Sequence, residues 1–126
     1  MDTVTDSILL TIKRMIGYDD DYDVFDHDLI IHINGLIARL NQVGPTLAED
    51  FYLEDSTATW DDYFSKLAHP STGDWFTKTN LQMIKDYIYV ETKIVFDPPT
   101  SSFVLEALKE QGKEMEWRIS CFADKK

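Results

Sequence analysis

Three aspartates at alternate positions give this sequence its clearest hint of metal chemistry. Asp19, Asp21 and Asp23 match the first half of a calcium-binding loop, in which carboxylates two residues apart reach a single ion. The second half does not follow, because a loop starting at Asp19 needs glycine at its sixth position and glutamate at its twelfth, where the chain has Val24 and Ile30. The spacing therefore favours an acidic connector between helices over a calcium site.

The histidines and the cysteine show no pattern typical of catalysis or of metal binding. His27, His32 and His69 lack the spacing of a zinc site. On a helix, Asp28 and His32 would form either a surface pair, the favoured interpretation, or part of a metal site completed by other ligands. Cys121 has no histidine near it in the sequence and is interpreted as a buried or incidental thiol. No phosphate loop, nucleophile elbow or His-Glu-x-x-His motif occurs, so we expect no catalytic, cofactor-binding or metal-binding residues.

The composition is that of an acidic globular protein. The 126 residues suit one domain with one core, and 44% hydrophobic content is too high for a disordered chain. Twelve basic against twenty-three acidic residues give a net charge of -11, which repels nucleic-acid phosphates and anionic lipids. We therefore expect no sequence-specific nucleic-acid binding and no membrane binding. A single cysteine and the lack of a signal peptide or a membrane-spanning run indicate synthesis and retention in a cytoplasm.

Hydrophobic periodicity predicts an all-α bundle of about four to five helices, organised around a central helix near residues 79–96. That helix carries two apolar stripes about 130° apart, which is typical of a helix packed between neighbours. The stripes consist of Leu81, Ile84, Ile88 and Val95, and of Met83, Tyr87, Val90 and Ile94. The prolines at 98–99 must end the helix near Phe96, since they lack an N–H donor and disfavour helical backbone before them. Thr100 or Ser101 can then cap the next helix.

Shorter patterns predict the remaining elements. Amphipathic spacing indicates helices over residues 6–16, 28–42, 59–67 and 102–121. Phe51 and Leu53 alternate briefly, which is compatible with a short strand near residues 51–54 or with a packed loop. We expect a single helical domain over residues 1–126, with a mobile tail from about residue 120.

The first and last of these helices are each predicted to carry one apolar stripe. In the first helix, one face is shared by Ile8, Leu9, Ile12, Met15 and Ile16, and in the last helix the stripe consists of Val104, Leu108, Met115 and Ile119, with Phe103 and Ala107 at its side. Lys13 and Arg14 lie near the end of the first helix, where positive charge suits the helix dipole.

Two places carry apolar side chains away from the predicted core. Ile31, Gly35 and Ala38 form a shallow second face on the helix over 28–42, which another subunit or an element of the same domain can cover equally well. Trp117 falls among charged residues on the polar side of the last helix. It is either an anchor at an interface or a ring folded over neighbouring side chains.

Several stretches taken together resemble the head-tail connector proteins (adaptor or head-completion proteins) of long-tailed bacteriophages and prophages. The stretches are Asp28–Asn34, Thr59–Asp62, Lys85–Tyr89, Phe96–Phe103 and Glu114–Arg118. The similarity extends from about residue 5 to residue 119. Its most specific part is the Phe-Asp-Pro-Pro segment, followed by an amphipathic helix that ends in Glu-Trp-Arg.

The resemblance implies a structural protein without enzyme activity or a required cofactor. It implies a subunit that can be monomeric when free, self-associates into a ring, docks beneath the portal ring and extends the DNA channel. The ring would link the capsid to the tail by binding the next connector, stopper or tail component, at the head-tail interface of a virion assembled in a bacterial host. The candidate partner-binding residues are Ile31, Gly35, Ala38, Trp117 and Arg118. The acidic connector over 19–26 either faces the channel or a basic partner, or is a solvated loop.

Two other function classes make different predictions. An acidic binding module that mimics DNA charge and occupies a basic DNA-binding protein would place carboxylates at phosphate-like spacing along one face. Here the acids are spread along the chain, with one cluster over residues 19–28. A small enzyme that uses scattered carboxylates would need a pocket with perturbed pKa values, and no residue pattern supports one.

Overall fold

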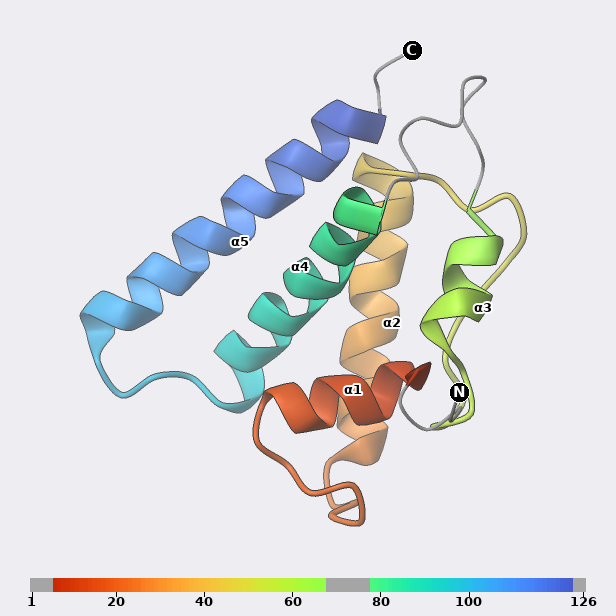
Figure 1. The fold of residues 1–126 in the computed structure, drawn as a ribbon. Coiled ribbons are helices and arrows are strands. Elements are labelled where there is room, and N and C mark those ends of the chain that lie inside the picture. Colours follow the sequence, from red (N-terminus) through yellow and green to blue (C-terminus); the bar gives the residue numbers. More distant parts are fainter. Residues whose placement is uncertain (1–5, 68–77, 124–126) are drawn as a thin grey trace.

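The computed structural model describes residues 6–67 and 78–123, over which the chain forms five helices and no sheet (Figure 1). The helices are α1 (Ile8–Met15), α2 (Asp26–Val43), α3 (Trp60–Ser65), α4 (Lys78–Phe96) and α5 (Ser102–Ala123). The prediction of a small all-α bundle is confirmed. The predicted helix break over residues 69–73 and the approach to the central helix over 74–76 lie outside the described residues.

Helix α4 lies at the centre of the bundle and contacts α1, α2 and α5. Ile84 and Ile88 from its first stripe and Tyr87 from its second are buried, so the helix packs on two sides as predicted. Val95 is an exception, because it belongs to the last turn and is exposed beside the proline hinge. The helix ends at Phe96, and the N–H of Val104 donates to Ser101 Oγ at the start of α5, so Ser101 is the cap.

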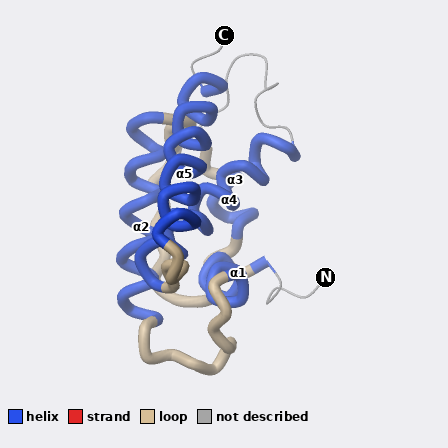
Figure 2. The backbone as a smooth tube through the Cα atoms, turned by 90° about the vertical axis from the view of Figure 1, so that its left-hand side faces the viewer, coloured by secondary structure: helices blue, strands red, loops and turns tan. Residues whose placement is uncertain are grey.

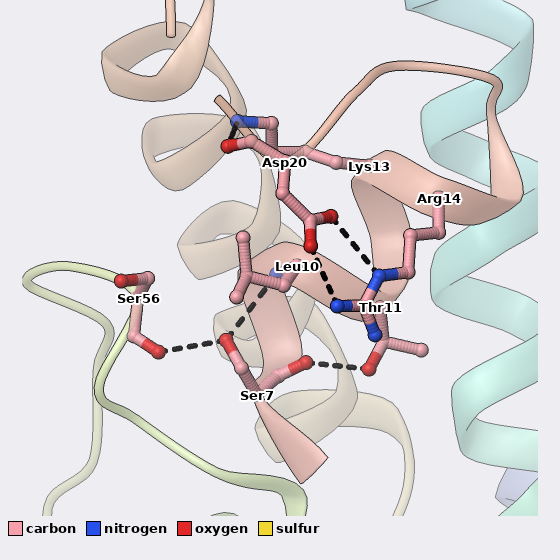
Figure 3. Close-up of polar contacts among 7 residues, drawn as sticks. All are labelled: Ser7, Leu10, Thr11, Lys13, Arg14, Asp20 and Ser56. Carbon is pink, nitrogen blue, oxygen red and sulfur yellow. Dashed lines mark hydrogen bonds and ion pairs between the residues drawn. The ribbon is translucent and has the colours of Figure 1, made fainter. Parts of the chain in front are cut away.

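Helix α1 begins and ends with local signals that the sequence shows. Ser7 Oγ accepts a hydrogen bond from the N–H of Leu10 and donates one to the carbonyl oxygen of Ser56, at 2.7 Å, which ties the helix start to the segment before α3 (Figure 3). Gly17 follows the helix with a φ of 93°, a left-handed conformation that favours glycine. Met15, on the predicted apolar face, is exposed because the buried arc of α1 is rotated towards Lys13.

Lys13 lies in the last turn of α1, as the sequence predicts, and it is completely buried. Its Nζ donates to the carbonyl oxygen of Asp20 at 2.9 Å and pairs with the Asp26 carboxylate at 2.8 Å. Arg14 donates two hydrogen bonds, of 3.0 and 2.6 Å, to the Asp20 carboxylate (Figure 3). The acidic connector between α1 and α2 is therefore fastened to α1 at both basic residues. Tyr18 adds a hydrogen bond from its hydroxyl to the carbonyl oxygen of Phe96, at the end of α4.

The segment near residues 51–54 is a packed loop, and the short strand considered there does not form. The Asn34 side chain on α2 supplies the hydrogen bonds that a partner strand would give, accepting from the N–H of Leu53 at 2.6 Å and donating to its carbonyl oxygen at 3.0 Å. Phe51 stacks on Tyr63 of α3 with ring centroids 5.3 Å apart. Helix α3 itself starts at the predicted cap, Thr59.

Helix α5 continues through Ala123, past residue 120, where we expected a mobile tail to begin. Residues 124–126 lie outside the described part of the chain. In Figure 1, the first turns of α5 lie at the edge of the molecule away from α3, and in Figure 2 α5 stands in front of α4 with α2 beside it. Among the described helices, none is long and apolar enough to cross a membrane.

Candidate partner-binding surface

A polar cluster fastens the C-terminal half of α5 to two other helices. The Arg39 guanidinium on α2 donates to both carboxylate oxygens of Glu116 at 2.6 and 2.8 Å, and the Tyr87 hydroxyl on α4 donates to the same carboxylate at 2.8 Å. Hydrogen bonds from Arg39 hold the pKa of Glu116 below its ordinary value, although partial burial opposes the shift. Burial, helped by Glu116, raises the pKa of the Tyr87 hydroxyl. The cluster fixes the rotation of α5 about its own axis.

The packing next to this cluster is close. Gly112 is buried, and a Cβ atom placed on it would overlap the Glu91 carboxylate on α4. Burial first and the charge of Glu116 second raise the pKa of Glu91. Ile119, one turn after Glu116, is completely buried, and its side chain would be only 2.8 Å from a Cβ on Gly44 at the end of α2.

With Glu116 and Ile119 directed inward, Trp117 projects from the outer side of α5 and is 65% exposed. The ring therefore does not fold into the core, and the sequence-based placement on the polar side is correct. Arg118 is exposed beside it and pairs with Glu114 at 2.7 Å. Both Trp117 and Arg118 line a shallow groove of about 680 Å³ on the surface of α5, so the structure brings these two candidates together.

A second open groove lies between α4 and α5 and measures about 600 Å³. Its lining residues are Thr79, Gln82, Met83, Asp86, Gln111, Glu114, Met115 and Arg118. Met83 and Met115 are partly buried against the core and supply its apolar surface. We call this the Met83–Met115 groove. Arg118 lines both grooves, which makes the C-terminal half of α5 a continuous candidate surface.

The remaining candidates form a separate face on α2. Ile31 is 58% exposed, and Gly35 and Ala38 are exposed as well. A Cβ added to Gly35 would meet nothing within 4 Å. This face is thus open and is not covered by another described element of the domain. The α5 grooves are lined by α4 and α5 residues, so the five candidates divide into two places.

Sequence reasoning missed a third exposed apolar place, at the turn between α4 and α5. Phe103 is 82% exposed and Val104 45% exposed, and Val95 on α4 is exposed near them in sequence across the hinge. We call these three residues the α4–α5 tip. Val104, on the predicted apolar stripe, and Phe103 and Ala107 at its side are exposed, because α5 begins at the edge of the bundle (Figure 1). The proline pair directly before an apolar helix start is the sequence signal that marks this turn.

Comparison with known protein families gives a match for this chain. A family model described as phage connector protein matches residues 8–126, which is nearly the whole sequence. The chain belongs to the phage connector protein family. As a member, this connector protein is a structural component of a phage particle that contacts other head or tail proteins, in a family whose role is structural and not enzymatic. No curated protein and no solved structure matches the chain.

The residues first considered for chemistry lie elsewhere in the connector. His32 is half-buried against Phe96, with ring centroids 5.5 Å apart, and burial lowers its pKa. In the described part of the chain, His32 Nε2 is buried without a hydrogen-bond partner and no ion pair joins His32 to Asp28, so the expected surface pair does not form. Cys121 is exposed and forms no disulfide. Of the two interpretations, a buried thiol is therefore excluded and an incidental thiol remains. Over residues 6–67 and 78–123, no group of three or more metal-binding side chains is placed to hold an ion.

Proposed function

We propose that this connector protein is a subunit of the ring that docks beneath the portal, extends the DNA channel and links the capsid to the tail. The observation that carries the proposal is the placement of large exposed apolar side chains at separate sites on one small chain. Trp117, Phe103 and Ile31 lie on three different parts of the described structure. A subunit of a closed ring needs separate surfaces for its neighbours and for the layers above and below it.

The two candidate surfaces named above suit the layers of a connector. Trp117 with Arg118 combines an aromatic ring and a guanidinium, the residue types most enriched among energetically dominant interface contacts. The face of Ile31, Gly35 and Ala38 is apolar, and the space beside Gly35 is open, which allows close approach of another helix. We propose that the Trp117–Arg118 surface binds the portal ring and that the α2 face binds the next connector, stopper or tail component. A free subunit can stay monomeric, because each surface is small.

The charge of the chain suits a channel through which DNA passes. With a net charge of -11, the subunit repels the phosphate backbone, so packaged DNA is not held by electrostatic attraction to the channel wall. In the acidic connector between α1 and α2, Asp20 and Asp26 are neutralised by α1, whereas Asp19, Asp21 and Asp23 are exposed. We propose that these three carboxylates face the channel.

Cosedimentation with the portal ring of the same phage or prophage, at physiological and at high salt, tests the proposal. We expect stoichiometric binding that persists at high salt, because apolar contacts are not screened. Trp117→Ala should weaken binding, while Gln42→Ala, at an exposed position on α2, serves as the matched control. Failure of the unmodified protein to bind the portal contradicts the proposal. Capture of a basic DNA-binding protein only at low salt would favour the charge-mimic alternative.

A further inference from the structure

We propose that neighbouring copies of this chain join head to tail, with the α4–α5 tip of one copy inserted into the Met83–Met115 groove of the next. The inference rests on the proposed ring and names its contact. It gives a binding site to Phe103, the most exposed large apolar side chain among the described residues, and an occupant to the open groove between α4 and α5.

The tip is suited to contact between copies because it carries no net charge. Between residues 93 and 109, the chain has two lysines and two acids. Lys93 pairs with Asp97 at 3.0 Å, and Lys109 pairs with Glu106 at 3.5 Å. Two chains that each carry a charge of -11 repel each other, and the repulsion is least where an approaching segment is neutral. The neutral segment is also the one that presents Phe103 and Val104.

The groove is suited to receive an aromatic side chain. Met83 and Met115 offer flexible, polarisable thioethers, which adapt to an inserted ring and form favourable contacts with it. The charged groups at the rim already have partners, since Arg118 pairs with Glu114 and Gln82 Nε2 donates to the Asp86 carboxylate at 3.0 Å. A tip that covers the groove therefore meets an Arg118 already paired with Glu114 and an Asp86 carboxylate that already accepts a hydrogen bond.

The tip cannot fill the groove of its own chain. Phe103 and Met115 lie on the same helix, twelve residues apart, which places them about 18 Å from each other along α5. A second copy can bring its tip to the groove, and the resulting interface uses two different surfaces. Such a heterologous contact generates a ring when the rotation between copies closes.

Cross-linking on the assembled complex tests this contact. In a Cys121→Ser background, one chain carries Ser102→Cys beside the tip, and a second chain with a larger tag carries Gln111→Cys at the groove. Both positions are exposed, and the substitutions keep Phe103 and both methionines. With the portal ring present, a short bis-maleimide should join the two unlike chains. Gln42→Cys on α2 replaces Gln111→Cys in the matched control and should not be joined.

The outcomes separate the two proposals. Subunits that bind the portal without a tip-to-groove cross-link, or that cross-link equally well to Gln42→Cys, overturn the inference and leave the connector function standing. Subunits that do not bind the portal overturn the proposed function. A further variant, Phe103→Ser, should lower the yield of cross-linked pairs by about tenfold without changing the thermal midpoint of the free subunit. An unchanged yield, or attachment of the Ser102→Cys chain to the portal in place of a second subunit, would also overturn the inference.

Discussion

The two halves of α5 carry one apolar stripe, but they differ in what covers it. In the C-terminal half, Ile119 is buried and Glu116 is held by side chains from α2 and α4. In the N-terminal half, Phe103 and Val104 belong to the same predicted face and are exposed. An apolar stripe thus indicates which side of a helix will be covered, and leaves open whether the cover comes from the same chain.

The difference has a simple structural origin. The end of α2 reaches the C-terminal half of α5, where Ile119 approaches Gly44. The N-terminal half begins after the proline hinge, at the edge of the bundle in Figure 1. There the helix is held by its cap and by exposed ion pairs within α5, which contribute little to stability. We expect the two halves to respond differently to substitution.

The largest contrast should come from shortening one side chain in each half. Ile119→Ala should lower the free energy of unfolding by about 2 to 5 kcal/mol, because it leaves a cavity in the core. Phe103→Ala should change it by less than about 0.5 kcal/mol, since the ring is 82% exposed. Denaturant midpoints of the two variants measure the contrast. Similar losses for both would mean that the N-terminal half is packed in solution.

A smaller effect should follow from removing charge at the cluster that fastens the C-terminal half. At neutral pH, Glu116→Gln should cost about 1 kcal/mol, because solvent screens a pair in which Arg39 is half exposed. The lowered pKa of Glu116 gives stability that is present above the ordinary carboxyl pKa of 4.5 and is lost as pH falls through the folded-state value. Unfolding of the variant should therefore depend less on pH below 4.5 than unfolding of the unmodified protein.

Substitution of Glu91 is a control, because its pKa is shifted in the opposite direction to that of Glu116. Its raised pKa means that the charged form is disfavoured in the folded state, so its cost is present at neutral pH and disappears as pH falls through the raised value. Glu91→Gln should stabilise the protein at pH 7, where Glu116→Gln destabilises it. Thermal midpoints between pH 7 and pH 4 distinguish the two, and shifts of the same sign would contradict the account of the cluster.

Substitution of two helical glycines should change the free energy of unfolding by about as much as substitution of Glu116, or by less. Gly35→Ala should raise the free energy of unfolding by about 0.5 to 1 kcal/mol, since alanine favours the helix and the added methyl group meets nothing. Gly112→Ala gains the same helix preference but must displace the Glu91 carboxylate, so its effect should be smaller or destabilising. Comparison of the two thermal midpoints tests whether the packed half of α5 is as close to α4 as the structure shows.

The smallest effect on stability should come from Trp117→Ala. The side chain is 65% exposed, so the free energy of unfolding should change by less than about 0.5 kcal/mol. The variant should weaken portal binding in cosedimentation, whereas Phe103→Ser should lower the yield of the cross-link between the tip and the groove. If Trp117→Ala unfolds the free subunit, the residue belongs to the core and the assignment of the α5 surface is wrong.

Local signals predicted much of this fold. The end of α4 at the proline pair and the caps at Ser101 and Thr59 depend on a few neighbouring residues, and they occur where the sequence placed them. The central position of α4 was also predictable, because two apolar stripes require cover on two sides. Trp117 was correctly placed on the outer side of α5, because helical periodicity puts it among the charged residues of that helix.

Features that depend on distant segments were not predictable. Lys13 is buried because Asp20 and Asp26 fold back onto it, and Leu53 needs no partner strand because Asn34 on α2 bonds to it. The exposure of Val104 depends on where the neighbouring helices end, and the hydrophobic periodicity of α5 carries no information about those ends. The candidate surface was accordingly half predicted, with Trp117 and the α2 face found in the sequence and the α4–α5 tip found only in the structure.

The complete burial of Lys13 makes its amine a chemical reporter of motion in the subunit. An acylating reagent can reach Nζ only when α1 or the acidic connector opens, whereas Lys109 and Lys113 on α5 remain accessible as internal references. The ratio of labelling rates, read by mass spectrometry, would measure how often this corner opens in the free subunit. The same ratio inside an assembled particle would show whether incorporation locks the corner shut.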